Sequence, residues 1–442
     1  MSFETGLGAY PDQERLQALL EALEAPQSRF TRLEAHYAGR APLSYIAPEA
    51  RALLAGRWDQ LGTNLPRLVV TSLAERLRVT GFTGTHGTQA WDVWRRNDLD
   101  QWAGSMHREA LTLGVGYAIV WADAGGKARV SVEPASMVSH LTDPATGQVT
   151  SAIKRWSHAR GTTAIVYLPD ELQTWEARST HSSIGGFEKV RTVPNPLGVV
   201  PVVPMVNTER LDGIGVSELT DVAPLADALA KTLSDLLVGS EYAARPRRWA
   251  TGIELEEDPE TGEPVNPFGE SSRMMISESE GSKFGQLPGS DLGGYESVVK
   301  VLVSQIMAVS SLPAHYVGVL SNQPASADAL RAAEAGLVAR VEARQQVFGK
   351  AWEQVIRLAV AVEDRTTPPG IDAQVVWADP ATRSVAQEAD SVVKLFQSGL
   401  LPASYALARL GYNAEEIALI NQARERDAAA NVDLSTVLGG GS

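Results

Sequence analysis

The chain has 442 residues, of which 44% are hydrophobic and 21% charged, so it can form two or three folded units and is not a wholly disordered protein. It has no cysteine, and its seven histidines lack the spacing of a zinc motif, so we expect no disulfide, no metal and no other cofactor. The net charge of −14 argues against tight clamping of nucleic acid through many phosphates, but it is compatible with nucleic acid that slides past the protein.

The first part of the chain has the periodicity of helices. Four leucines repeat at the spacing of one helical face, and they are Leu16, Leu19, Leu20 and Leu23. A second helix is predicted over 28–37, and further helices over 64–73 and from 91 onward. Each of the last two leads into a short apolar stretch, at 77–82 and 117–121, that predicts a strand.

Short strands separated by turns are predicted from 127 to 206. Within this region the string Asp143-Pro144-Ala145-Thr146-Gly147 has a pattern that recurs at 258–262. Proline fixes φ and glycine supplies a positive φ, so both strings predict hairpin turns. A metal site on their aspartates is the alternative, although no glutamate follows as in a calcium loop.

Two helices with an irregular insert between them come next. The first covers 217–241, where Pro224 marks a kink or a new start, and the second covers 295–311 and is apolar on several sides. Between them, 253–280 holds nine acidic residues and one basic residue. This charged stretch is either a solvated face or a surface that meets a partner.

A loop after Pro313 leads into a helix of about 38 residues over 326–363, which predicts a long strut or a kinked pair. A helical module over 383–427 and a flexible tail over 428–442 end the chain. The N-terminus, from Met1 to Tyr10, has neither the basic start nor the apolar stretch of a signal peptide.

Several catalytic motifs are missing from the sequence. It has no G-x-x-x-x-G-K-[ST] phosphate loop and no G-x-S-x-G elbow, and Gly114-Val115-Gly116 lacks the third glycine of a dinucleotide fingerprint. We therefore expect no catalytic residues and no enzymatic activity of the chain itself.

Short strings in a fixed order along nearly the whole chain resemble the portal proteins of tailed bacteriophages, of the type known from siphophages of Gram-positive hosts. The strings are 36–40 (HYAGR), 75–82 (ERLRVTGF), 215–219 (GVSEL), 313–318 (PAHYVG), 324–330 (PASADAL) with Glu334, and, near the C-terminus, 389–391 (ADS), Lys394, 399–400 (GL) and 410–412 (LGY).

The resemblance implies an α+β, mainly helical subunit of a ring around a central channel, with a wing, a stem, a clip and a crown. The order helix, insert, helix supports this, because two antiparallel helices would carry the insert at their far end. The expected boundaries are wing 1–215 (a helical start, then an α/β part), stem helix 216–243, clip 244–292, stem helix 293–312, tunnel loop 313–325, long wing helix and strand 326–379, crown 380–427 and flexible tail 428–442.

The resemblance also implies a homo-oligomeric ring, typically of twelve subunits, that is assembled in the host cytoplasm and sits at one capsid vertex of the virion. Double-stranded DNA would pass through the ring during packaging and ejection. The other partners would be the terminase, neck or adaptor proteins, and capsid and scaffold proteins, and no contact with a membrane is expected. Two alternatives are another phage structural or adaptor protein without a DNA channel, and a packaging enzyme.

By resemblance, the tip of the tunnel loop faces DNA, and its residues are Val319, Leu320, Ser321, Asn322 and Gln323. Gly318 and Pro324 would be its hinges, and the whole stretch 313–325 contains no Lys, Arg, Asp or Glu. An ordinary surface loop is the alternative.

Two further sets of residues are predicted to make contacts. The first set is Arg245, Arg247 and Arg248, which precede the acidic stretch. These arginines would either meet a partner or DNA at the clip, or lie solvated at the end of a helix. The apolar residues expected at the stem interface between subunits are Val299, Val303 and Met307.

Overall fold

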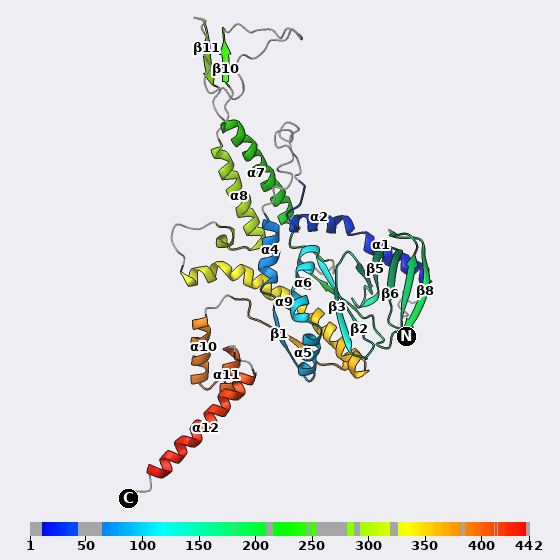
Figure 1. Cartoon of the computed structure of the whole chain (residues 1–442), viewed down its shortest axis with the longest axis vertical. Helices are drawn as coiled ribbons and strands as arrows, with labels where there is room; N and C mark the ends of the chain where they lie inside the picture. Colours follow the sequence, from blue (N-terminus) through cyan, green and yellow to red (C-terminus); the bar gives the residue numbers. More distant parts are fainter. Residues whose placement is uncertain are drawn as a thin grey trace. The chain divides into compact units, whose positions relative to one another are not determined.

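The computed structural model describes residues 11–42, 64–180, 182–208, 215–244, 248–252, 281–286, 292–318, 326–381, 385–410, 412 and 414–438. The chain divides into two compact units, Met1–Pro380 and Ala381–Ser442. The first combines helices with antiparallel sheets, and the second is helical (Figure 1). The predicted α+β class is confirmed.

The first unit begins with α1 (Asp12–Glu24) and α2 (Gln27–Tyr37), close to the predicted helices. The four leucines predicted on one face of α1 are all buried, in a cluster with Ile153, Val166 and Trp175 of a five-stranded sheet. The amphipathic pattern of α1 therefore places it across this sheet (Figure 1).

Two antiparallel sheets occupy the middle of the unit. The smaller has the order β3-β2-β9, formed by β2 (Val115–Ala122), β3 (Ala128–Glu133) and β9 (Val202–Val206). The larger is a meander of β4 (Val138–Thr142), β5 (Val149–His158), β6 (Gly161–Tyr167), β7 (Glu171–Ala177) and β8 (Phe187–Pro194).

The predicted hairpin turn at 143–147 links β4 and β5. The Asp143 N–H donates to the carbonyl of Gln148 at 2.9 Å, and Gly147 has a φ of 69°. Proline and glycine in this string thus do what the prediction required of them. The second string, at 258–262, lies outside the described residues.

A close approach of two backbones explains the glycine at the start of β2. Gly114 has a φ of 95°, and a Cβ there would lie 2.6 Å from the carbonyl oxygen of Gly215. Gly215 is equally confined, since its Cβ would lie 2.2 Å from the Gly114 oxygen. The two glycines let the end of α6 (Leu99–Leu113) touch the segment that leads into the stem.

The helix α9 (Ala327–Asp364) is continuous over 38 residues, as its length in the sequence predicted. Its second half is not an exposed strut, because Phe348 and Trp352 are fully buried. Trp352 meets Trp94 of α5 (Gly87–Arg96) edge-on, with ring centroids 4.8 Å apart. The same core includes α4 (Leu65–Ala74) and the paired strands β1 (Val79–Thr83) and β12 (Gln374–Trp377), and the turn η2 (Pro368–Gly370) follows α9.

The predicted helix pair around the insert is α7 (Val222–Ala244) and α8 (Gly293–Ser310), which run antiparallel (Figure 1). Pro224 lies in the first turn of α7, so it marks a start rather than a kink. Between them in sequence, β10 (Arg248–Thr251) and β11 (Lys283–Gln286) pair as an antiparallel ribbon. The acidic stretch 253–280 lies outside the described residues.

The second unit contains α10 (Val385–Gln397), α11 (Ala403–Arg409) and α12 (Ala414–Leu438). The helix α12 continues to Leu438, so the tail predicted from 428 onward begins as helix, and its flexibility stays a prediction. Alanine has the highest helix propensity, and three consecutive alanines at 428–430 carry the helix into this stretch. None of the described helices is long and apolar enough to cross a membrane.

His107 is a titratable group enclosed in the aromatic core. The indole N–H of Trp352 donates to its Nε2 at 2.8 Å, so the proton of the neutral ring must lie on Nδ1. Nδ1 faces the Leu77 carbonyl without an aligned hydrogen bond. Burial disfavours the charged ring and lowers the pKa of His107 from 6.5 to about 3.

This lowered pKa predicts that acid destabilises the subunit. Below pH 6.5 His107 binds a proton in the unfolded chain, whereas in the folded chain it stays neutral down to about pH 3. The free energy of unfolding therefore falls as the pH drops. His107 contributes up to about 1.4 kcal/mol per pH unit to this fall. In denaturant unfolding between pH 6.5 and pH 4, His107→Gln, which keeps an acceptor for Trp352, should show a shallower slope. Equal slopes for parent and variant would contradict this account.

Candidate functional site at the base of the stem

The stem helices α7 and α8 meet α4 in an apolar cluster. Its buried members are Val69, Val222, Leu229, Ile306 and Leu312. Leucine repeats on α7 and apolar residues on α8 fill this space because both helices carry a stripe at helical spacing. The cluster therefore holds α7 and α8 to each other and to α4.

The predicted subunit contacts on α8 lie on the inner side of this pair. Val299, Val303 and Met307 are half-buried and pack against the cluster within the same chain. The apolar side chains that α8 leaves exposed are different ones, namely Val298 (47% exposed), Val301 (59%) and Val309 (37%). The subunit contact at the stem stays a prediction, and its candidate residues change to these three.

A buried carboxylate lies just before the start of α7. The Glu218 side chain is 1% exposed, and its Oε1 accepts hydrogen bonds from Nε of Arg344 at 2.8 Å and from Nδ2 of Asn207 at 3.0 Å. Its Oε2 lies 2.8 Å from Nη2 of Arg340, as an ion pair without the alignment of a hydrogen bond. Two guanidinium groups of α9 therefore neutralise one carboxylate out of contact with water.

Backbone contacts aim Glu218 at α9. The Glu218 N–H donates to the Leu111 carbonyl at 2.9 Å, which fixes this residue to the end of α6. The hydroxyl of Ser217 donates to the Thr112 carbonyl and accepts from the Leu219 N–H at 3.0 Å. The string at 215–219 is thus a rigid turn whose one acidic side chain points to α9.

Arg340 also reaches the other stem helix. Its Nη1 donates to the Val309 carbonyl at 2.8 Å, in the last turn of α8, where helix carbonyls lack partners within the helix. The base of α7, the end of α8 and the middle of α9 are therefore joined through Arg340 and Glu218. Sequence reasoning missed both arginines, although their spacing of four places them on one helical face.

A second polar cluster lies where the predicted tunnel loop begins and ends. It joins Arg76, which follows α4, with Tyr316 of η1 (Ala314–Val317) and Glu334 of α9. Burial alone would lower the pKa of Arg76, but the hydrogen bond to Tyr316 and the charge of Glu334 raise it above its ordinary value. All three residues belong to the strings that resemble portal proteins, and the fold brings them together.

Most of the predicted loop and clip residues lie outside the described residues. They are Val319, Leu320, Ser321, Asn322, Gln323, Pro324, Arg245 and Arg247. Gly318 is described and has a φ of 75°, so a positive φ occurs where the hinge was predicted. Arg248 lies at the start of β10, opposite Gln286 of β11.

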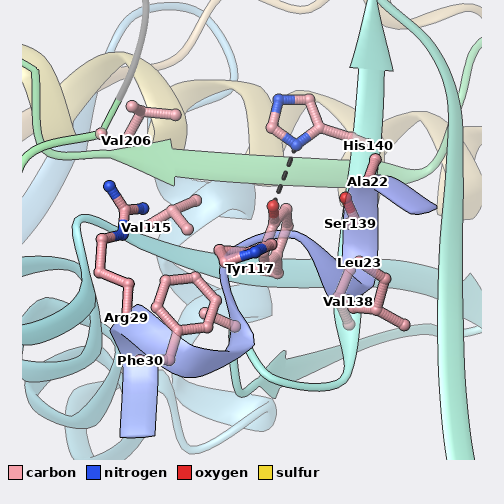
Figure 2. Close-up of a pocket in the computed structure, with 13 residues that line it drawn as sticks. Ala22, Leu23, Arg29, Phe30, Val115, Tyr117, Val138, Ser139, His140 and Val206 are labelled. Atoms are coloured by element: carbon pink, nitrogen blue, oxygen red, sulfur yellow. Dashed lines mark hydrogen bonds between the residues drawn. The ribbon is translucent and has the colours of Figure 1, made fainter. Parts of the chain in front are cut away.

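A cavity of about 330 Å³ lies between the α1–α2 elbow and the two sheets. In Figure 2, the Tyr117 hydroxyl points to Nδ1 of His140, at 3.0 Å. Burial raises the pKa of Tyr117 and lowers that of His140 to about 4, so both are uncharged at neutral pH. The pair joins β2 to β4, one strand from each sheet. Among the residues that the structure describes, no cluster of three His, Asp or Glu side chains could hold a metal ion.

Comparison with known proteins gives the class of this chain. Residues 19–430 match a family model described as phage portal protein, SPP1 Gp6-like. The portal proteins of Mycobacterium phage D29 and Mycobacterium phage L5 are each 31% identical over 393 residues, covering 84% of this chain and 80% of theirs. The chain therefore belongs to the phage portal protein family, and the resemblance drawn from its sequence is confirmed.

Solved structures show a fainter likeness. A chain from the neck of an empty GTA particle is 13% identical, with a TM-score of 0.49, covering 83% of this chain and 94% of that one. A chain from the virion of a native gene transfer agent particle is 14% identical, also with a TM-score of 0.49, covering 86% and 98%. The family assignment rests on the family model and on the two phage relatives.

The Glu218 junction predicts a large effect from one substitution. Glu218→Gln keeps the size of the side chain but removes its negative charge, so the positive charges of Arg340 and Arg344 lose their partner. We expect this substitution to lower the free energy of unfolding by about 3–5 kcal/mol. Denaturant unfolding measures this. Glu296→Gln, on the exposed Glu296–Lys300 pair of α8, is the control and should leave the unfolding midpoint unchanged. Equal midpoints for the two variants would contradict the assigned role of Glu218.

Proposed function

We propose that copies of this chain form a ring, of twelve subunits as the family resemblance implies, at one vertex of a phage capsid. Double-stranded DNA passes through the central channel during packaging and ejection, and the subunit itself is structural rather than catalytic. The observation that carries the proposal is the exposed apolar stripe on α8, in a chain that belongs to the portal family. An apolar stripe on a helix of a soluble ring protein is best buried against the next subunit.

The stripe lies beside the face that packs within the subunit. Val298, Val301 and Val309 recur at spacings of three and eight, which places them on one side of α8. Val299, Val303 and Met307 occupy the neighbouring side, towards α7. One face of α8 thus builds the subunit and the next face is available to bind a second copy.

We place the clip at 244–292, as the sequence predicted, and infer that it docks the terminase during packaging and neck or adaptor proteins afterwards. The ribbon of β10 and β11 supports this, because it interrupts two antiparallel helices as the predicted order requires. Arg245, Arg247 and Arg248 are the candidate contacts for acidic groups of a partner or for DNA at the exit.

We assign the DNA-facing role to the segment from Val319 to Gln323. Support comes from its composition, because the stretch 313–325 has no Lys, Arg, Asp or Glu. Neutral tips touch the phosphate backbone weakly and release it, which translocation requires, whereas a ring of cations would hold it. From the same family membership we infer that capsid and scaffold proteins are further partners, that the ring is assembled in the host cytoplasm and that it is part of the virion.

The stem proposal is tested by two valines on one helix. Val301→Asp should abolish rings and leave the subunit folded, because Val301 is 59% exposed in the isolated chain and would be buried only in the assembly. Val303→Asp should instead lower the unfolding midpoint, since Val303 packs inside the subunit. Light scattering and negative-stain images report assembly, and denaturant unfolding reports stability. Rings of Val301→Asp at the parental concentration would overturn the proposed interface.

The loop proposal is tested by adding charge at its tip. Asn322→Lys combined with Gln323→Lys should slow packaging, because 6–10 phosphate contacts already give tight binding that weakens with salt. The matched neutral control is Asn322→Ser with Gln323→Ser. Packaging is measured as DNA protected from nuclease at low and high salt, with rings checked by microscopy. Packaging by the lysine variant at the parental rate, irrespective of salt, would contradict the DNA-facing role.

A further inference from the structure

Tyr316 and Glu334 lie on opposite sides of segment 319–325 in the sequence, and they meet in space. Tyr316 is in η1, directly before the segment, and Glu334 lies about two turns into α9, after it. The Tyr316 hydroxyl donates to Oε1 of Glu334 at 3.4 Å, and Nε2 of His315 lies 3.5 Å from the same oxygen. One carboxylate therefore holds the last turn before the segment against the helix that follows it.

Arg76 ties this contact to the core of the wing. Its Nη2 lies 2.7 Å from the Tyr316 hydroxyl, to which it donates, and 3.2 Å from Oε2 of Glu334. Its Nη1 donates to the Pro380 carbonyl at 2.6 Å, and the next residue, Leu77, is buried in the main core. The Arg76 and Glu334 side chains are only 14% and 10% exposed, so solvent screens their attraction less than at the surface.

Another near-buried carboxylate of α9 provides a contrast. Glu353 pairs with Lys350 at 3.2 Å and with Arg357 at 3.4 Å, and both partners belong to α9 itself. Glu334, by contrast, binds side chains of η1 and of the chain after α4. The first arrangement stabilises a helix, whereas the second fixes separate parts of the chain to one another.

We propose that Arg76, Tyr316 and Glu334 are positioning residues that fix η1 to α9 and to the wing, so that segment 319–325 departs from and returns to fixed points. Ser326 is the return point. It is the N-cap residue of α9, and its side chain accepts a hydrogen bond from the Ala329 N–H at 3.2 Å. The proposal rests on the proposed DNA-facing role of the segment. In a ring, the described residues on either side of the segment, Gly318 and Ser326, then hold the same positions in every subunit.

The absence of cysteine in the chain allows a direct test without DNA. Ala314→Cys creates a single labelling site at an exposed position of η1, and a nitroxide there reports how firmly η1 is held in the assembled ring. Tyr316→Phe removes the hydroxyl that bridges Arg76 and Glu334, and we expect the ratio of mobile to immobile label to rise about fivefold. Glu334→Gln should raise it as well, whereas Glu353→Gln, the matched control on the same helix, should leave it unchanged. Equal spectra for Tyr316→Phe, Glu334→Gln and the parent would overturn the proposal.

A packaging assay on the same variants, without the label, tests the positioning role. Tyr316→Phe should form rings as the parent does and package DNA several-fold more slowly, while Glu353→Gln should match the parent in both. Packaging at the parental rate by Tyr316→Phe rings, when the labelled Tyr316→Phe rings show increased mobility of the label, would overturn the positioning role. Failure of parental rings to package DNA would count against the channel function alone, since the label experiment measures the contact without DNA.

Discussion

The burial of Glu218 between two arginines of α9 is the interaction on which the arrangement of the stem depends. Removing the Glu218 carboxylate and the Arg344 guanidinium group from water is unfavourable unless every partner is in place. Glu218 is held by the end of α6, and Arg340 also binds the last turn of α8, so the partners meet only when wing, stem and α9 are assembled together. The junction therefore selects one arrangement of these elements more than it adds net stability.

The helix α9 connects two environments with different physics. Its second half is held by dense apolar packing around Phe348 and Trp352, which has no charge to compensate. Its first half carries Glu334, Arg340 and Arg344, which bind segments that enter and leave the stem. A helix anchored in the core thus presents polar side chains at fixed positions, and the stem helices and η1 are placed by these side chains.

Local patterns predicted the elements well, because their causes lie within a few residues. The leucines of α1, the turn at 143–147 and the length of α9 were all evident in the sequence. The continuation of α12 past 427 was not predicted, although the three consecutive alanines at 428–430 favour a helix there. The sequence could not show which valine of α8 packs inside the subunit and which is exposed. The helix is apolar on several sides, and only its packing against α7 turns Val303 inward and leaves Val301 exposed. The two arginine partners of Glu218 are more than a hundred residues away in the sequence, beyond the reach of any local pattern.

The same long-range pairing bears on the proposed passage of DNA through a ring of acidic subunits. Arg76, Arg340 and Arg344 lie near the base of the stem, where free guanidinium groups would bind phosphate. Each is paired with a carboxylate that is at most 10% exposed, Glu334 for the first and Glu218 for the other two. Their charge is therefore used inside the subunit to fix its elements, and the segment between Gly318 and Ser326 adds no Lys or Arg of its own. Arginines engaged in ion pairs inside the subunit, next to a segment without charged residues, are what the proposed weak hold on DNA requires.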